Sequence, residues 1–204
     1  PPHMSDHYYS PKPTAASDRQ TIVATLRGKK YTFITDAGVF SRREVDFGSK
    51  LLIESMVIPM DADVLDVGCG YGPIGLVAAD LAGNGTVTMI DINERAVATA
   101  RENAERLGVR NVRILQSDQF EALGNEQFDV ILTNPPIRAG KSVVHGIFEG
   151  AYHRLRDGGS LWVVIQKKQG SPSAFTKLEE LFGNVREVTK EKGYRIFQAI
   201  KQNC

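Results

Sequence analysis

Hydrophobic positions follow strand spacing near the start of the chain and helical spacing soon after. The runs at 21–26 and 31–35 are rich in β-branched residues and flank the polar sequence Arg-Gly-Lys-Lys, which predicts a β-hairpin turning at Gly28. After a loop, the apolar residues between Leu51 and Met56 predict an amphipathic helix. Residues 21–60 are therefore expected to form a hairpin and helix ahead of the main pattern.

From residue 61 onward, strand-like and helix-like segments alternate. This alternation predicts an α/β, Rossmann-like core over residues 61–204, with a parallel sheet and helices on both faces. The stretch 185–201 holds two strand-like runs that turn near Gly193, so we expect an antiparallel hairpin at one edge of the sheet. The expected strands are 63–67, 86–91, 112–118, 128–133 and 160–166, and the expected helices are 73–82, 93–108, 142–155 and 171–183.

Composition places these elements in one ordinary globular domain. The 204 residues are 42% hydrophobic and 24% charged, and the net charge is +1. This balance excludes a strongly basic or acidic protein and leaves room for a local basic patch. The length suits a single domain over residues 21–204, preceded at 1–20 by a cloning scar before Met4 and a flexible arm.

Cysteine usage and hydropathy indicate the compartment. Cys69, Cys204 and the four histidines form no group at metal-ligand spacing, so we expect neither disulfides nor a metal site. No apolar run approaches the roughly 20 residues of a membrane span, and no signal peptide is visible. The sequence therefore predicts a cytoplasmic protein without membrane contact, as a monomer or weak dimer.

A glycine-rich turn follows the first strand of the alternating region. Gly68, Gly70 and Gly72 occupy alternate positions after the acidic Asp66, and glycine lets a backbone turn tightly and approach a ligand closely. Gly70 also begins a Gly-x-Gly-x-x-Gly pattern, ending at Gly75, that is typical of dinucleotide binding. The tight turn starts at Gly68, which favours a nucleoside-methionine site over a dinucleotide site.

Two acidic residues stand where the next strands end. Asp91 closes the second core strand, where a carboxylate can accept both hydroxyls of a ribose, and Ile92 can cover an adenine face. Asp118 closes the third strand and can accept from the exocyclic amine of adenine, beside Gln119. Because ligands of such sheets bind at the carboxyl ends of the strands, we expect these residues to surround one cofactor.

These motifs resemble a known enzyme family. The segments 25–54 and 193–201 look like the catalytic domain of the small-subunit ribosomal RNA (guanine-N2) methyltransferase family, especially its single-domain bacterial members. Four core motifs are similar to class I S-adenosyl-L-methionine-dependent methyltransferases: Val-Leu-Asp-Val-Gly-Cys-Gly-Tyr-Gly-Pro-Ile-Gly at 64–75, Ile-Asp-Ile-Asn at 90–93, Ser-Asp-Gln-Phe at 117–120 and Asn-Pro-Pro-Ile at 134–137.

The resemblance implies a cofactor, a partner and a sheet topology. It implies the strand order 3-2-1-4-5-7-6 with strand 7 antiparallel, and S-adenosyl-L-methionine as the cofactor. The implied reaction is methylation of the exocyclic N2 of a guanine in ribosomal RNA or the small ribosomal subunit. The residues expected to bind the cofactor are Asp66, Gly68, Cys69, Gly70, Gly72, Asp91, Ile92, Asp118, Gln119 and Asn134.

Asn134 ends the fourth core strand and begins the loop expected to act on the substrate. An amino group on an sp² carbon is a poor nucleophile, and a site helps it by accepting both of its N–H hydrogens. The side-chain oxygen of Asn134 and the carbonyl oxygen of Pro135 suit this role. Pro135 and Pro136 also stiffen the loop. Families with this loop usually carry a stacking aromatic residue next, and here it is Ile137.

Basic residues follow the same strand ends. Arg138 and Lys141 come after the Asn134 loop, and Lys167 and Lys168 come after the fifth strand, so we expect them on one rim, where they can hold RNA phosphates. Further residues that can extend this patch are Arg27, Lys29, Lys30, Arg42 and Arg43.

Three other functions remain open from the sequence. Methylation of a protein-glutamine amide, or of another amino group, needs the same two acceptors. An NAD-dependent oxidoreductase would use Gly70 to Gly75, although no hydride-transfer partner is evident. A non-catalytic RNA-binding module would keep the fold without turnover.

Overall fold

The computed structural model of the chain describes residues 18–36 and 44–202. Of the predicted arm only 18–20 is described, and Arg19 already belongs to the first strand. Arg42 and Arg43 of the predicted patch lie outside the described residues.

The elements are β1 (Arg19–Leu26), β2 (Lys29–Asp36), α3 (Phe47–Ser55), β3 (Asp63–Val67), α4 (Pro73–Leu81), β4 (Thr86–Asp91), α5 (Glu94–Leu107), β5 (Val112–Gln116), β6 (Phe128–Thr133), η1 (Ile137–Ala139), α6 (Lys141–Arg154), β7 (Leu155–Gln166), η2 (Lys167–Gln169), α7 (Ser171–Phe182), β8 (Val185–Glu191) and β9 (Tyr194–Ile200).

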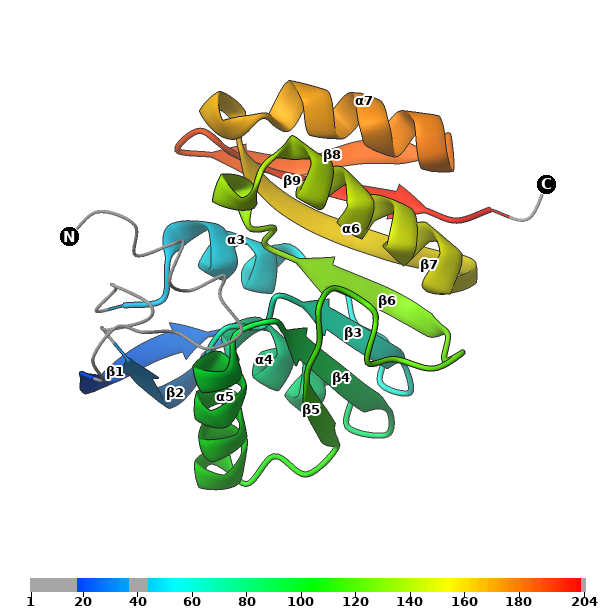
Figure 1. Cartoon of the computed structure of the whole chain (residues 1–204). Helices are drawn as coiled ribbons and strands as arrows, with labels where there is room; N and C mark the ends of the chain where they lie inside the picture. Colours follow the sequence, from blue (N-terminus) through cyan, green and yellow to red (C-terminus); the bar gives the residue numbers. More distant parts are fainter. Residues whose placement is uncertain (1–17, 37–43, 203–204) are drawn as a thin grey trace.

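A seven-stranded sheet runs through the centre of the molecule in the order β5-β4-β3-β6-β7-β9-β8 (Figure 1). The strands from β5 to β7 pair in parallel, whereas β9 is antiparallel to both of its neighbours, β7 and β8. Counted from β3, this is the order 3-2-1-4-5-7-6 with a reversed strand 7. The predicted fold class, including the antiparallel edge hairpin, is therefore confirmed.

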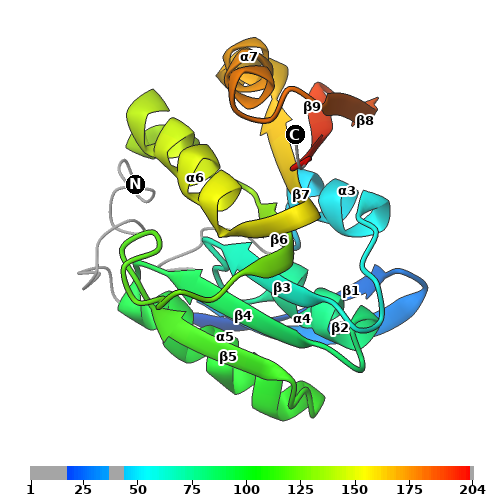
Figure 2. The same ribbon diagram turned by 90° about the vertical axis from the view of Figure 1, so that its right-hand side faces the viewer.

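Helices cover both faces of this sheet (Figure 2). The core on one face includes side chains of α3, α4 and α5, and the core on the other face includes side chains of α6 and α7. Successive residues of β3 alternate between the two, since Val64 belongs to the first core while Leu65 and Val67 belong to the second. Asp66 therefore points toward α4.

Two hairpins turn through a basic residue followed by glycine. The β1–β2 turn holds Arg27 at φ 54° and Gly28 at φ 78°, and the β8–β9 turn holds Lys192 at φ 50° and Gly193 at φ 82°. Positive φ at both central residues is the geometry that matches the twist of two-residue hairpins. The predicted turns at Gly28 and near Gly193 are both confirmed.

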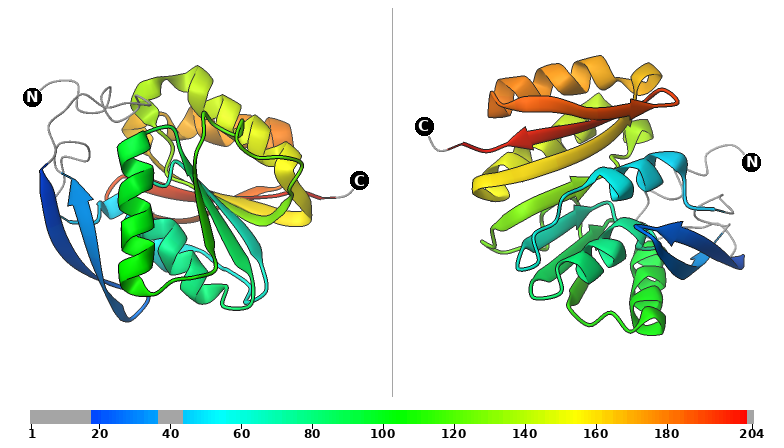
Figure 3. Two further views of the ribbon diagram at one scale, coloured as in Figure 1. Left: turned by 60° about the horizontal axis from the view of Figure 1, so that its bottom comes forward. Right: turned by 180° about the vertical axis from the view of Figure 1, so that it is seen from behind.

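The β1–β2 hairpin lies outside the central sheet, beside α5 (Figure 3). The fully buried Asn103 of α5 holds it there, because its Oδ1 accepts from Ile34 N at 2.7 Å and its Nδ2 donates to Ile34 O at 2.9 Å. The same Nδ2 donates to Tyr71 O at 2.9 Å. One amide therefore ties the hairpin to the glycine-rich turn.

Several element boundaries differ from the sequence-based expectation, and α3 begins at Phe47 instead of near Leu51. β7 begins at Leu155, five residues early, because Leu155 pairs with Phe128 across a register irregularity between Phe128 and Val130. β5 ends at Gln116, and Asp118 lies in the turn that follows.

Among the helices of the described residues, none has the length and apolar character needed to cross a membrane.

Candidate active site

The glycine-rich turn leaves β3 through three residues with positive φ. Gly68, Gly70 and Gly72 have φ values of 76°, 56° and 110°, a region that residues with a Cβ rarely adopt. The N–H groups of Gly68 and Cys69 both donate to Ile90 O, at 2.8 and 2.9 Å, which holds the turn against the end of β4. A Cβ placed on Gly68 would meet no atom within 4 Å, so the turn leaves open space at the carboxyl end of β3.

Gly75 has a different task from the three glycines before it. A Cβ there would lie 2.7 Å from Met89 Sδ and 2.8 Å from Asp66 Oδ2, so glycine lets α4 pack closely on the sheet.

Cys69 is also a packing residue, because it is 4% exposed and belongs to the core. Burial raises the pKa of its thiol well above the usual value. Because the side chain is buried, a cofactor would contact Cys69 through its backbone.

Asp91 connects the glycine-rich turn with the start of α5. Its Oδ2 accepts from Gly70 N at 2.9 Å, and its Oδ1 accepts from Asn93 N at 2.9 Å. Asn93 in turn caps α5 by accepting from Ala96 N. A carboxylate has about four lone-pair sites, so Asp91 can also accept from a bound hydroxyl. Ile92, next to it, is half-buried.

Asp66 is a buried acid next to this turn with a raised pKa. It is fully buried, and no donor in the described part of the chain makes a full hydrogen bond to either carboxyl oxygen. Burial raises the pKa of Asp66 to about 8; the charge of Asp91 adds to this shift, and the nearby Gly75 N–H opposes it. Because Asp66 is fully buried, it can act on a cofactor only through the turn above it.

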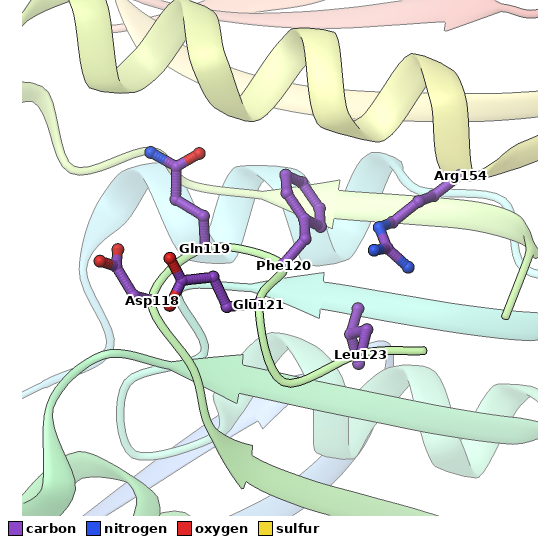
Figure 4. A pocket seen from close by; sticks show the side chains of 6 residues that line it. All are labelled: Asp118, Gln119, Phe120, Glu121, Leu123 and Arg154. Carbon is purple, nitrogen blue, oxygen red and sulfur yellow. The ribbon is translucent and has the colours of Figure 1, made fainter. Parts of the chain in front are cut away.

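The turn after β5 lines a pocket of about 540 Å³ (Figure 4). Gln119 adopts a positive φ of 51°, and Ser117 Oγ braces the turn by donating to Gln119 O at 2.8 Å. Phe120 points toward α6, where the missing side chain of Gly150 makes room for its ring. The lining residues are Asp118, Gln119, Phe120, Glu121, Leu123 and Arg154.

Asn134 follows the end of β6 and is held by α3. Thr133 pairs with Val67 across the sheet, so Asn134 and the glycine-rich turn begin at the same edge. Asn134 Nδ2 donates to Ser49 Oγ at 3.0 Å and to Asp46 Oδ2 at 3.3 Å. Within the described residues no donor reaches Asn134 Oδ1 or the Pro135 carbonyl. The two expected acceptors therefore remain available.

The rest of this loop is compact. Pro135 is buried and Pro136 is half-buried, and the Pro136 carbonyl accepts from Ala139 N at 2.9 Å in the short helix η1. Ile137 is half-buried and packs on the core that α6 and α7 cover. Part of the Ile137 side chain is thus already in contact with the protein's own core.

The predicted basic patch divides into two groups. Lys141, Lys167, Lys168 and Arg138 are exposed and lie after the ends of β6 and β7, which are neighbouring parallel strands. Within the described residues none of them forms an ion pair. Two of the three hairpin residues have partners: Arg27 Nη1 donates to the Met56 carbonyl at 2.9 Å and to two carbonyls of α3, and Lys29 pairs with Asp80 at 2.8 Å. Lys30 is exposed.

A family model described as the methyltransferase small domain matches residues 30–198. The chain belongs to this methyltransferase family. The resemblance stated from the core motifs is confirmed, and membership in this family does not support the NAD-dependent alternative for Gly70 to Gly75.

Within the described residues no group of three or more His, Cys, Asp or Glu side chains could hold a metal ion.

Several known proteins are similar to most of this chain. The Bacillus subtilis protein YbxB is 57% identical and covers 97% of this chain and 100% of its own length. The small subunit ribosomal RNA methyltransferase C of Sodalis glossinidius is 31% identical over 81% of this chain and 47% of its own. A T. thermophilus 16S rRNA N2 methyltransferase, solved with AdoMet and guanosine, superposes with TM-score 0.80 at 30% identity, over 92% of this chain and 52% of its own. This chain thus spans about half the length of the two relatives named for ribosomal RNA.

Sequence reasoning missed Asp46 and Ser49. An aspartate three residues before a serine, ahead of an apolar helix, is a recognisable start of a helix, and Asp46 Oδ1 does accept from Ser49 N at 2.7 Å. Nothing local in the sequence indicates that the same two side chains reach Asn134, which lies more than 80 positions later.

Proposed function

We propose that this protein is an S-adenosyl-L-methionine-dependent methyltransferase that modifies the exocyclic N2 of a guanine in ribosomal RNA. Two relatives named for ribosomal RNA support the substrate class, and one of them was solved with AdoMet and guanosine. The observation that carries the proposal is the pair of acceptors at Asn134 Oδ1 and Pro135 O, at the sheet edge where the glycine-rich turn begins. A ribosomal RNA substrate would place the enzyme in the cytoplasm.

The residues at this edge fit the proposed cofactor. Gly68 leaves space where a Cβ would stand, and Gly70 and Gly72 allow the backbone to approach a ligand closely. Asp91 is suited to accept the ribose hydroxyls, and Asp118, Ile92 and Gln119 are proposed around the adenine, beside the pocket after β5. We assign the amino-acid end of the cofactor to the turn from Gly68 to Gly72.

The chain's own groups would prepare the amino nitrogen for attack. Asn134 Oδ1 and Pro135 O each accept one of its N–H hydrogens, which holds the nitrogen in place and increases its electron density. The bound cofactor supplies a sulfonium methyl group, so that the nitrogen lone pair forms the new N–C bond and the S–C electron pair returns to sulfur. The acceptors remain beside the nitrogen as it becomes acidic and loses one proton to water. A separate strong base is therefore unnecessary.

The test uses purified protein, S-adenosyl-L-methionine labelled in its methyl group, and two RNA substrates. These are an unmodified transcript of the small-subunit ribosomal RNA and small ribosomal subunits from cells that lack this enzyme. We expect label in RNA and, after digestion to nucleosides, in N2-methylguanosine. Label in ribosomal protein with none in RNA would instead support the glutamine alternative. Unlabelled RNA and protein in both substrates would refute the proposal for small-subunit ribosomal RNA.

A further inference from the structure

We propose that Asp46 and Ser49 set the direction of the Asn134 amide and so make the site select a hydrogen-bond donor. This inference rests on the proposed role of Asn134 and assigns two positioning residues to it. Both lie at the start of α3, in the N-terminal extension, which is the hairpin and helix within residues 21–60. Ser49 is buried, and Asp46 and Asn134 are half-buried, so the three side chains meet in a partly buried position.

The chemistry of the three groups permits one orientation of the amide. A carboxylate only accepts hydrogen bonds, and an amide carries a donor on nitrogen and an acceptor on oxygen. With Nδ2 toward α3, Asn134 donates to Asp46 Oδ2 and Ser49 Oγ. Rotating the amide by 180° would place Oδ1 against the Asp46 carboxylate and lose that bond. The pair therefore keeps Oδ1 directed away from α3.

The direction of the amide decides which substrates the site can pair. With Oδ1 and the Pro135 carbonyl presented together, the site offers two acceptors and suits an amino group, which has two N–H donors. A ring nitrogen that carries no hydrogen, or a carbonyl oxygen, is an acceptor and would leave both groups unpaired. Leaving buried polar groups unpaired can produce discrimination of about 10⁴-fold in sites built for hydrogen bonding. Asp46 thus acts on specificity without touching the substrate.

The two oxygens of Asp46 have separable tasks. Oδ1 caps α3 by accepting from Ser49 N at 2.7 Å, and Oδ2 accepts from Asn134. Asparagine is as good a helix cap as aspartate, so Asp46→Asn should keep the helix. Its new NH₂ group would face the NH₂ group of Asn134, and the amide of Asn134 would turn to relieve this contact. This isosteric change therefore separates the cap from the orientation.

The experiment compares four variants for methylation of the RNA substrate that wild type modifies. Removing one well-placed polar contact to a reacting group typically costs 10²–10³-fold, so for Asp46→Asn we expect kcat to fall about 100-fold. Asp46→Ser keeps a cap and introduces no opposing donor, and Ser49→Ala leaves the Asp46 contact, so both should lose about 10-fold. The control is Asp61→Asn, an exposed residue outside the site, which should match wild type.

Two further measurements separate orientation from folding and from the proposed function. Melting temperature and affinity for S-adenosylhomocysteine should be unchanged in Asp46→Asn. In wild type, the Asn134 side-chain NH₂ protons should be hydrogen-bonded and exchange slowly by NMR, and Asp46→Asn should make them exchange faster. Undiminished kcat in Asp46→Asn would refute the inference. If wild type methylates no RNA, the proposed function fails, and the exchange measurement alone decides whether Asp46 orients Asn134.

Discussion

The two halves of the sheet's carboxyl edge hold their polar groups in different ways. On the β3–β5 side, Asp91 accepts from Asn93, two residues away, and from Gly70, 21 residues away. On the β6 side, Asn134 is held by Ser49 and Asp46, which precede it by 85 and 88 residues. These two contacts on the proposed cofactor side thus join residues of the alternating core. The proposed substrate side is completed by the N-terminal extension.

The largest effect should come from Asn134→Ala, which removes the acceptor on the substrate side. We expect kcat for RNA methylation to fall about 1,000-fold, because the amino group would keep only the Pro135 carbonyl. Affinity for S-adenosylhomocysteine, measured by calorimetry, should stay within a few-fold of wild type. A large loss of this affinity would show that the two halves are not separate.

Asp91→Ala tests the other half of the edge. Hydrogen bonds to a charged group contribute about 1.5–3 kcal/mol each, so the loss of one or two ribose contacts should weaken S-adenosylhomocysteine binding about 100-fold. Asp91→Asn, which keeps the volume of the side chain, should show a smaller loss if the Gly70 contact is partly preserved. Wild-type affinity in both variants would remove Asp91 from the proposed cofactor site.

A smaller effect is expected from the basic rim beside Asn134. Lys168→Glu should weaken binding of the small-subunit RNA transcript about 10-fold at low salt, and the difference should shrink as salt rises. The matched control is Arg110→Glu, which makes the same charge change at an exposed position next to the amino end of β5. Equal losses in both variants would point to net charge instead of a located RNA surface.

The smallest effect concerns the buried acid beneath the cofactor side. The pKa of Asp66 is raised from 3.8 to about 8, so the folded protein binds one more proton than the unfolded chain between these values. The contribution of Asp66 to stability is therefore present at low pH, falls as pH rises through this window, and levels off above about pH 8. Asp66→Asn lacks this titration and should melt several degrees higher than wild type at pH 8 but not at pH 4.5. A constant difference across this range would contradict the raised pKa.

The fold followed from local patterns because each element carries its own signals. Asn93 and Gly108 mark the ends of α5, and alternate glycines mark the turn after β3. The early start of β7 depends on a partner elsewhere in the chain, because Leu155 pairs with Phe128 across a register irregularity. The site divides in the same way. Asp91 and Asn134 could be found from their place at strand ends, whereas Asp46 could be recognised only as a helix cap.

The buried side chain of Asn103 limits how this protein can be recombined with its relatives. Its amide serves both backbone groups of Ile34 and the carbonyl of Tyr71. A chimera could replace the hairpin with a strand that follows a different path. The buried amide of Asn103 would then lack hydrogen-bond partners, which would lower the free energy of unfolding by about 1–3 kcal/mol. Such exchanges should therefore succeed only when the incoming strand presents both an N–H and a carbonyl group to α5, or when Asn103 is replaced together with the hairpin.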